Sequence, residues 1–508
     1  MIKHKIILTG LALSLAGTVL AQNEVDVLRY SFSDFGGSAR VQALGGAQAA
    51  LGADISNTIV NPAGLGLFRR SEFTITPSIG FNSAESMLRN GGNTNSPYTD
   101  TRNNFNVANI GVVFTELKDD DPYNDWKSGA FGITFSRINS FQSNYTYQGT
   151  IAADDNVSLL NSLAQSGTRK LQSNPGFDGE LSGGGQDLIS LEALGYWTYL
   201  LDTSSVYNDF IPVARRGNIV QSERIESRGA QNQWDFAYGA NFRDKLYIGG
   251  GLGLVTFTYR QQRTYTETEE SMDTYFRKFT LQDNLNTSGA GFNLKGGLIY
   301  RPSDVVRFGA SLQSPTFYSL NDEFDTSLSG EFDPGYLPGG ATSISNDLLP
   351  GEFDYNLTTP FRATAGVAVF ASKYGFLTAD AEFVNYSQGR LNSDFDETLR
   401  DVNNDVKNAY GKAMNYRIGI EGRMDIFRGR IGFAHYGDPF NNQAFERSKK
   451  FYTAGVGIKK EKISFDVALV NSRYKTLYSP YALENAPNPL VETAFNNTNL
   501  LFTFGFTF

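Results

Sequence analysis

The sequence predicts an all-β protein, a 14-stranded antiparallel barrel that spans a membrane, and three observations support this prediction. Phe502, Phe504, Phe506 and Phe508 share one face of the last strand, with small polar residues on the other face. An apolar run near the start has the form of an export signal. Between these ends, alternation with period two recurs along the chain. A barrel strand turns its rings to lipid and its small polar groups to the lumen, which accounts for the alternation.

The first 21 residues read as a signal peptide. Lys3 and Lys5 precede an apolar run from Ile6 to Leu20, and the small residue Ala21 follows at the expected cleavage site. The run is too short for a membrane anchor, and no other stretch reaches the roughly 18 to 20 apolar residues of a spanning helix. We therefore expect residues 1–21 to be removed and the mature protein to lie in the outer membrane.

Composition fits the same location. Hydrophobic residues make up 40% of the chain, aromatic residues 13%, and there are 52 glycines. This is typical of a barrel, which needs apolar side chains only at alternate positions. The formal charge of −9 becomes −11 when Lys3 and Lys5 leave with the signal. An acidic chain argues against nucleic acid as a partner and leaves hydrophobic small molecules, outer-membrane lipid or another envelope protein.

The barrel is predicted to occupy residues 71–508, with connections that alternate between short and long. Short connections are periplasmic in such barrels and long ones are external, so both termini are expected in the periplasm. Residues 146–232 and 316–360 are the predicted extracellular cap. The fourteen candidate strands lie near 71–82, 104–115, 129–145, 233–243, 246–260, 290–301, 305–314, 361–371, 375–386, 415–425, 429–437, 450–459, 463–473 and 498–508.

The first cap segment contains apolar residues at helical spacing, which predicts helices in the outer loops. Helices at the mouth of a barrel can form a lid that contacts an apolar ligand. Simple packing onto the barrel rim is the alternative. The candidate ligand contacts are Leu188, Leu191, Leu194, Trp197 and Leu201.

Residues 22–70 differ from the rest because they are dense in glycine and alanine and show little alternation. Such a segment suits a narrow space, so we predict a plug inside the lumen. The run Asn61-Pro62-Ala63-Gly64 is the candidate gate. Pro62 fixes its own backbone and moves Asn61 out of helical conformation, which predicts a rigid corner. An ordinary surface turn before the first strand is the alternative.

Six charged residues alternate with apolar ones on three consecutive predicted strands. Facing lipid, an arginine near the midplane would cost roughly 2 to 4 kcal/mol, so the charges are predicted to face the lumen. Charges of both signs can pair with each other and hold a plug. Direct recognition of a carboxylate headgroup is the alternative. The six residues are Asp380, Glu382, Arg417, Glu421, Arg423 and Arg430.

Catalytic chemistry is not expected. The mature chain has a single histidine, His435, and the sequence has no cysteine. Triads therefore have one histidine candidate, and zinc sites with two histidines have none. The glycine run Gly249–Gly253 lacks the strand-to-helix context of a nucleotide loop and instead indicates close wall packing. We predict no enzyme activity, no cofactor and no metal.

The N-terminal motifs resemble the plug of the FadL-type long-chain fatty-acid transporters, a superfamily that also includes channels for aromatic hydrocarbons. The motifs are Gly45-Gly46-Ala47, Gly52-Ala53-Asp54 and Asn61-Pro62-Ala63-Gly64. Weaker matches lie at 307–315, 359–360, 383–387, 416–422 and 430–439. The resemblance implies a fourteen-stranded barrel with an N-terminal hatch. It also implies passive uptake of long-chain fatty acids or similar hydrophobic compounds, and lateral exit through the wall near the third strand.

The loops differ from this pattern. The best-known members build the outer binding groove from the third and fourth outer loops, whereas the largest here is the second, 146–232. The Phe- and Asn-rich style also resembles Bacteroidetes relatives, some of which take part in protein secretion. The alternative function is therefore a barrel that serves as a docking or carrier subunit for exported proteins.

Overall fold

The structure is a computed structural model that describes residues 24–90, 93–118, 124–152, 157–174, 176–204, 208–215, 217–393 and 396–508. The predicted signal peptide lies outside these residues. The helices are α1 (Glu24–Ser31), α2 (Ala39–Ala43), α3 (Asn57–Val60), η1 (Pro62–Leu67), α4 (Leu159–Ser173), α5 (Phe177–Ser182), α6 (Leu191–Trp197), η2 (Pro338–Gly340), η3 (Tyr386–Gln388) and α7 (Asp396–Ala409). None of the described helices is long and apolar enough to cross a membrane.

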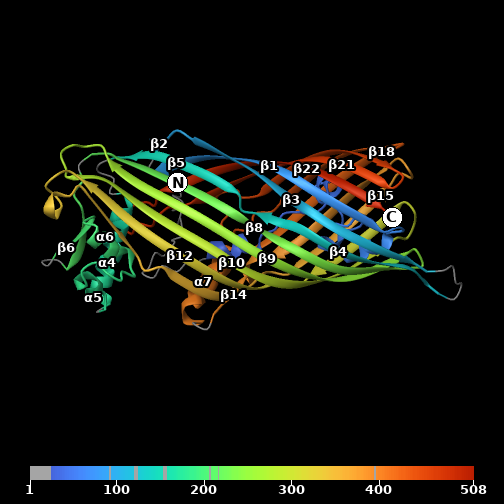
Figure 1. Ribbon diagram of the computed structural model, residues 1–508, viewed down its shortest axis with the longest axis horizontal. Coiled ribbons are helices and arrows are strands. Elements are labelled where there is room, and N and C mark those ends of the chain that lie inside the picture. The colour runs from blue at the N-terminus through green and yellow to red at the C-terminus, as the bar shows by residue number, and fades with distance from the viewer. Residues whose placement is uncertain are drawn as a thin grey trace, which may run out of the picture.

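Strands form nearly all the rest of the molecule (Figure 1). They are β1 (Glu72–Asn90), β2 (Asn93–Thr94), β3 (Tyr98–Leu117), β4 (Trp126–Ser140), β5 (Ser143–Ile151), β6 (Leu201–Ser204), β7 (Asp209–Pro212), β8 (Ile219–Phe242), β9 (Leu246–Glu269), β10 (Phe276–Tyr300), β11 (Val306–Gln313), β12 (Phe317–Phe332), β13 (Ser343–Asp347), β14 (Gly351–Thr358), β15 (Arg362–Phe370), β16 (Gly375–Asn385), β17 (Arg390–Asn392), β18 (Lys412–Met424), β19 (Phe427–Tyr436), β20 (Lys449–Lys460), β21 (Ile463–Tyr478) and β22 (Leu490–Thr507).

The sheet closes into a barrel because β1 pairs antiparallel with both β3 and β22. The wall has fourteen antiparallel strands, as predicted, and four of them are built from two segments each. The third is β4 with β5, the seventh β11 with β12, the eighth β14 with β15, and the ninth β16 with β17. Pro315 and Pro360 interrupt the seventh and eighth strands side by side, where Thr316 N–H donates to Thr359 Oγ1 at 2.8 Å.

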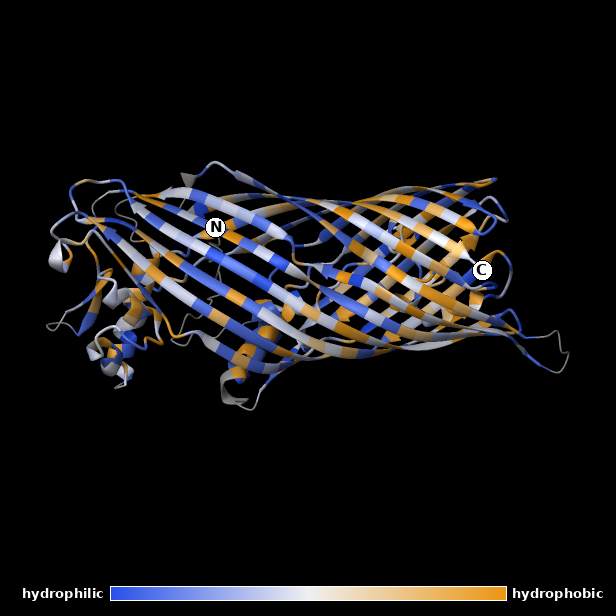
Figure 2. Ribbon diagram, viewed as in Figure 1, coloured by the Kyte–Doolittle hydropathy of each residue, from blue (hydrophilic) through white to orange (hydrophobic). Residues whose placement is uncertain are grey.

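One half of the barrel carries the apolar outer surface (Figure 2). On β10, for example, Phe292, Leu294, Leu298 and Tyr300 are all exposed. This half ends at the short turns and at the C-terminus (Figure 1). Closed antiparallel barrels with an even strand number and an outward apolar band are outer-membrane proteins. The chain is therefore an outer-membrane barrel.

The other half projects beyond this band, because several strands are longer than predicted. Strands β8 and β9 have 24 residues and β10 has 25. The predicted loop 316–360 consists mainly of β12, β13 and β14, and the loop predicted at 146–232 narrows to about 152–218. The predicted bounds of these two loops were wrong, because the strand extensions reverse the alternation of apolar and polar residues that marks a lipid-facing strand. They carry polar residues outside and apolar ones inside, so no lipid-facing row marks them as strands.

The segment before β1 lies inside the barrel (Figure 1), as the fold prediction required. Its helix α1 lies nearer the cap than η1 does. Tyr30 of α1 contacts Thr287 of β10 at 3.2 Å, whereas Asn61 contacts Leu298, eleven positions further along the same strand. The described chain therefore starts within the lumen. The expected periplasmic position of the N-terminus concerns residues before Glu24, which lie outside the described residues.

Candidate functional site

The candidate gate residues form the corner at which η1 begins. The side-chain oxygen of Asn61 accepts from Ala63 N at 3.2 Å, and Pro62 occupies the first position of the helix. The amide nitrogen of Asn61 donates to the carbonyls of Ala49, at 2.7 Å, and of Leu298, at 3.1 Å. One buried side chain thus joins two plug segments to the sixth wall strand. Gly64 completes the corner and packs on Asn57.

Glycines of the wall face this plug and allow its backbone to approach closely. A Cβ at Gly249 would lie 2.4 Å from Ala63 N, and one at Gly239 would lie 2.6 Å from Pro62 O. Real Cβ atoms do not approach backbone this closely, so glycine is required at these positions if the plug is to keep its place. Close wall packing, the predicted reason for the Gly249–Gly253 run, therefore accounts for Gly249, whereas Gly250 has no close neighbour of this kind. Other wall glycines against the plug are Gly111, Gly132, Gly297, Gly309, Gly366, Gly419, Gly432 and Gly455.

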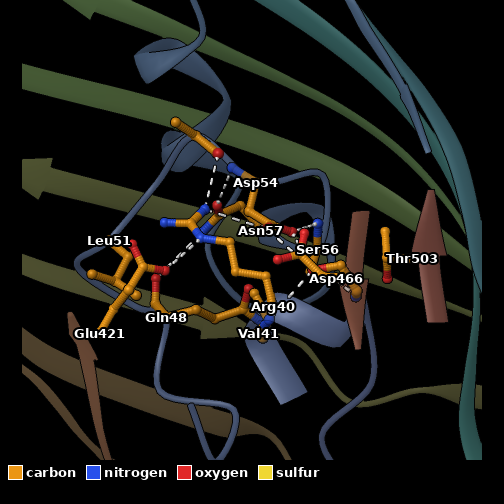
Figure 3. Close-up of polar contacts among 12 residues, drawn as sticks. Arg40, Val41, Gln48, Leu51, Asp54, Ser56, Asn57, Glu421, Asp466 and Thr503 are labelled. Carbon is orange, nitrogen blue, oxygen red and sulfur yellow. Dashed lines mark hydrogen bonds and ion pairs between the residues drawn. The ribbon is translucent and has the colours of Figure 1, made fainter. Parts of the chain in front are cut away.

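Arg40 of α2 connects the plug to the lumen charges (Figure 3). Its guanidinium lies 3.4 Å from the carboxylate of Asp54 and 3.4 Å from that of Glu421, and it donates to Ala53 O at 3.2 Å. Burial alone would lower the pKa of Arg40, but the Glu421 and Asp54 carboxylates outweigh it and raise that pKa. Arg40 therefore stays charged and links the two carboxylates.

All six predicted charges face the lumen, but they have different partners. Asp380 Oδ2 accepts from the backbone N–H groups of Gln48, at 2.7 Å, and Ala49, at 2.9 Å. Asp380 and Glu421 therefore contact the plug directly. The other four pair within the wall, through Arg417–Glu382 at 3.0 Å, Arg423–Glu421 at 2.6 Å, Arg430–Glu421 at 2.7 Å and Arg430–Asp466 at 2.5 Å.

A cavity of about 1470 Å³ lies inside the barrel beside the plug. None of the six predicted lumen charges lines it, which favours the plug-holding interpretation over direct headgroup recognition. Its apolar lining comes from the plug, from inward-facing wall residues and from the loop before β22. The main contributors are Leu28, Phe32, Phe35, Phe141, Tyr145, Phe451, Tyr474, Phe495, Pro480 and Leu483.

The five cap residues proposed as ligand contacts also lie away from this cavity. Leu188, Leu194 and Leu201 are buried in the cap core, and Leu191 and Trp197 pack against it. The same core contains residues of α4, β10 and β12, so the cap packs onto the rim of the barrel. The sequence does not distinguish the residues that line the cavity, because aromatic residues that face inward show the same period-two alternation as lipid-facing ones.

The third wall strand is discontinuous beside the cavity. Backbone pairing between β3 and β4 runs from Leu117–Ser128 to Asn109–Ser136, where it stops. Two positions later Ile138 is an extra residue in the pairing of β4 with β8, a β-bulge. Beyond it, among the described strands, β5 pairs with β8 alone. Arg102 of β3 spans the interval with side-chain bonds to Gln142, at 2.9 Å, and Asn144, at 2.7 Å.

Comparison with known proteins supports this architecture. No family model matches the sequence, and no curated protein matches it. Among solved structures, a Pseudomonas aeruginosa FadL homologue matches with a TM-score of 0.55 at 11% identity, over 94% of this chain and 99% of that one. The chain therefore has the fold of a FadL homologue, as the plug motifs led us to expect.

Two further structures match less well. The Pseudomonas putida toluene transporter TodX gives a TM-score of 0.49 at 13% identity, over 94% of this chain and 100% of its own. The Ralstonia pickettii toluene transporter TbuX gives 0.46 at 15% identity, over 93% and 99%.

Proposed function

We propose that the protein is an outer-membrane channel for passive uptake of long-chain fatty acids or similar hydrophobic compounds. The observation that carries the proposal is the 1470 Å³ cavity with its aromatic lining, bounded by the plug below and by the discontinuous third strand at its side. A water-filled bore is a poor path for an apolar molecule, since each Å² of apolar surface left in water costs about 25 cal/mol. An apolar cavity above a plug removes this cost.

The route has three parts in this proposal. The ligand enters beneath the cap and occupies the cavity. The plug, residues 22–70, blocks leakage through the barrel of residues 71–508. The ligand then leaves sideways at the interval between β3 and β5, where backbone pairing is missing. We also propose removal of residues 1–21 on export and a periplasmic C-terminus. The proposal includes no catalytic step.

Uptake of radiolabelled oleate by a transporter-deficient host tests the function. Wild-type protein should raise uptake above that of cells carrying an unrelated barrel at equal surface level. Unchanged uptake with a correctly inserted barrel would contradict transport of fatty acids.

Deletion of Ile138 tests the exit. This residue is the extra one in the bulge, and the pairing of Asn139 with Gln231 does not depend on it. The deletion should extend β3–β4 pairing and reduce uptake while the barrel folds normally. Deletion of Pro350, at the outer end of β14 and far from β3, is the control. Normal uptake by the Ile138 deletion would contradict lateral exit at this place.

A docking or carrier subunit for exported proteins is the second candidate function. Exposed apolar side chains at the outer end favour it, among them Met272, which is 82% exposed, and Tyr275, which is 58% exposed and stacks on Tyr336. Affinity purification from native membranes separates the two functions. A stoichiometric protein partner would favour docking, and co-purified lipid without such a partner would favour transport.

A further inference from the structure

The lining of the cavity contains more basic than acidic residues, although the protein as a whole is acidic. Its lining contains seven basic residues and two acidic ones, Asp34 and Glu223, whereas the whole chain carries a formal charge of −9. The basic residues are Lys449 together with Arg29, Arg89, Arg137, Arg263, Arg447 and Lys475. Carboxylates outside the lining offset part of this excess, because Asp26 pairs with Arg29, Asp283 with Arg263, and Glu492 with Arg89 and Lys475. The remaining basic groups can attract an anionic group to a space that also offers apolar side chains.

Lys449 places its ammonium among three aromatic rings of the lining. Its ammonium lies 5.0 Å from the ring centres of Phe451 and Tyr474 and 5.4 Å from that of Phe32. Its one carboxylate partner among the described residues is Asp34, with both oxygens at 2.8 Å. An amphiphile that places its chain among these rings would bring its head group to this ammonium.

Asp34 belongs to the plug segment 32–36, which also contacts the third strand. The Asp34 backbone N–H donates to Ile138 O at 3.0 Å, and Asn139 donates to Phe32 O at 3.0 Å. Gly36 packs so closely on the Arg137 carbonyl that a Cβ would lie 3.0 Å from its oxygen. One short segment therefore joins Lys449 of β20 to the bulge in β4.

We infer that Asp34 and Lys449 form a ligand-sensitive ion pair, in which Asp34 competes with the anionic head group of an amphiphile. An anion that takes Lys449 displaces the Asp34 carboxylate and frees segment 32–36 from β20. The contacts of this segment with Arg137, Ile138 and Asn139 then weaken at the point where wall pairing already stops. Lys449 thus sets the preference for anions, and the displacement of Asp34 couples anion binding to the contacts of segment 32–36 with the barrel wall. This inference rests on the proposed function of the cavity.

The test compares octanoate with 1-octanol as competitors of the neutral dye N-phenylnaphthylamine on the full-length protein in amphipol. Wild-type protein should prefer octanoate. Lys449→Met should reduce that preference by about tenfold or more, the usual weight of a hydrogen bond to a charged group, and leave 1-octanol unaffected. Asp34→Asn should increase octanoate affinity, because it removes the competing charge. Lys450→Met is the control, since Lys450 pairs with Glu446 at 3.2 Å outside the cavity.

Hydrogen exchange of residues 32–36 provides a second measurement. Its rate would not change if the substitutions altered only the affinity for the ligand. Octanoate should accelerate exchange there in the wild type and 1-octanol should not, and Asp34→Asn should exchange fast without ligand. An octanoate preference that survives Lys449→Met, or exchange that octanoate leaves unchanged, would overturn the inference and spare the proposed function. If neither compound displaced the dye from the wild type, both would be overturned.

Discussion

Substitution of Gly249 by alanine should displace the plug without unfolding the barrel. The added Cβ would lie 2.4 Å from Ala63 N and 2.5 Å from Pro62 C, and both are backbone atoms that cannot rotate away. Forcing one extra carbon into a packed interface costs about 1–3 kcal/mol. Because 1.4 kcal/mol is a factor of ten, the population of displaced plug should increase by about 5- to 150-fold.

Gly250→Ala is the matched control. This neighbour lies on the same strand but faces outward, and the nearest atom to its added Cβ, Lys295 O, is 3.6 Å away. Planar-bilayer recordings should show more frequent or larger openings for Gly249→Ala than for Gly250→Ala, with equal heat-modified mobility on gels as evidence of intact barrels. Identical conductance in the two variants would refute the idea that the wall glycines hold the plug in place.

Four further predictions follow from the contacts of the plug and the cap. Deletion of residues 22–64 should leave a folded barrel that leaks small hydrophilic solutes, and bilayer conductance equal to that of the intact protein would contradict the plug assignment. Arg40→Gln should weaken plug docking by about 1–3 kcal/mol, because Asp54 loses its cation, and faster hydrogen exchange of residues 38–43 would show this. Burial raises the pKa of Glu24, so the packing of α1 should be strongest below the unfolded-state pKa and weaken as pH rises through the raised value. The protection of α1 amides, measured relative to their intrinsic exchange rate at each pH, should therefore be lower at pH 8 than at pH 4, and Glu24→Gln should remove this difference in protection. Glu267→Ala should expose the cap to proteases, because Glu267 accepts from Ser158 Oγ at 2.6 Å and Leu159 N at 2.9 Å and so holds the start of α4, whereas Glu270→Ala should not.

The strand count could be predicted because the membrane imposes one rule on every strand. Wherever lipid lies outside, apolar residues recur with period two, as from Tyr416 to Ile420. The rule fails above the bilayer, where Asn284 and Asn286 face water and Leu281 faces the cap. Residues 316–360 therefore read as a loop although they form wall.

The plug contacts were only partly predictable, for a different reason. Charges that face the lumen can be recognised in a sequence, because a charged side chain on a membrane-spanning strand is too costly in lipid and must therefore point inward. Which of them meets the plug depends on barrel register, and Asp380 and Arg417 lie directly opposite each other yet have different partners. The cavity-lining residues gave no signal, since Phe451 faces inward and Tyr452 outward and both are aromatic.

The height of the wall discontinuity bears on where a ligand would leave. Outward aromatic residues on the first four wall strands, Phe81, Phe105, Phe135 and Trp234, mark the upper boundary of the apolar band, and Phe105 is 72% exposed. Above Trp234 the exposed outward residues on β8 are Arg228 and Arg224, so the surface becomes polar there. The bulge at Ile138 lies three residues above Phe135, at this boundary. A molecule that left between β3 and β5 would thus meet the bilayer at the top of its hydrocarbon region. At that depth an amphiphile could insert its apolar chain into the hydrocarbon and keep its charged head group in the polar layer. This position is favourable because it leaves neither the chain in water nor the charge in hydrocarbon.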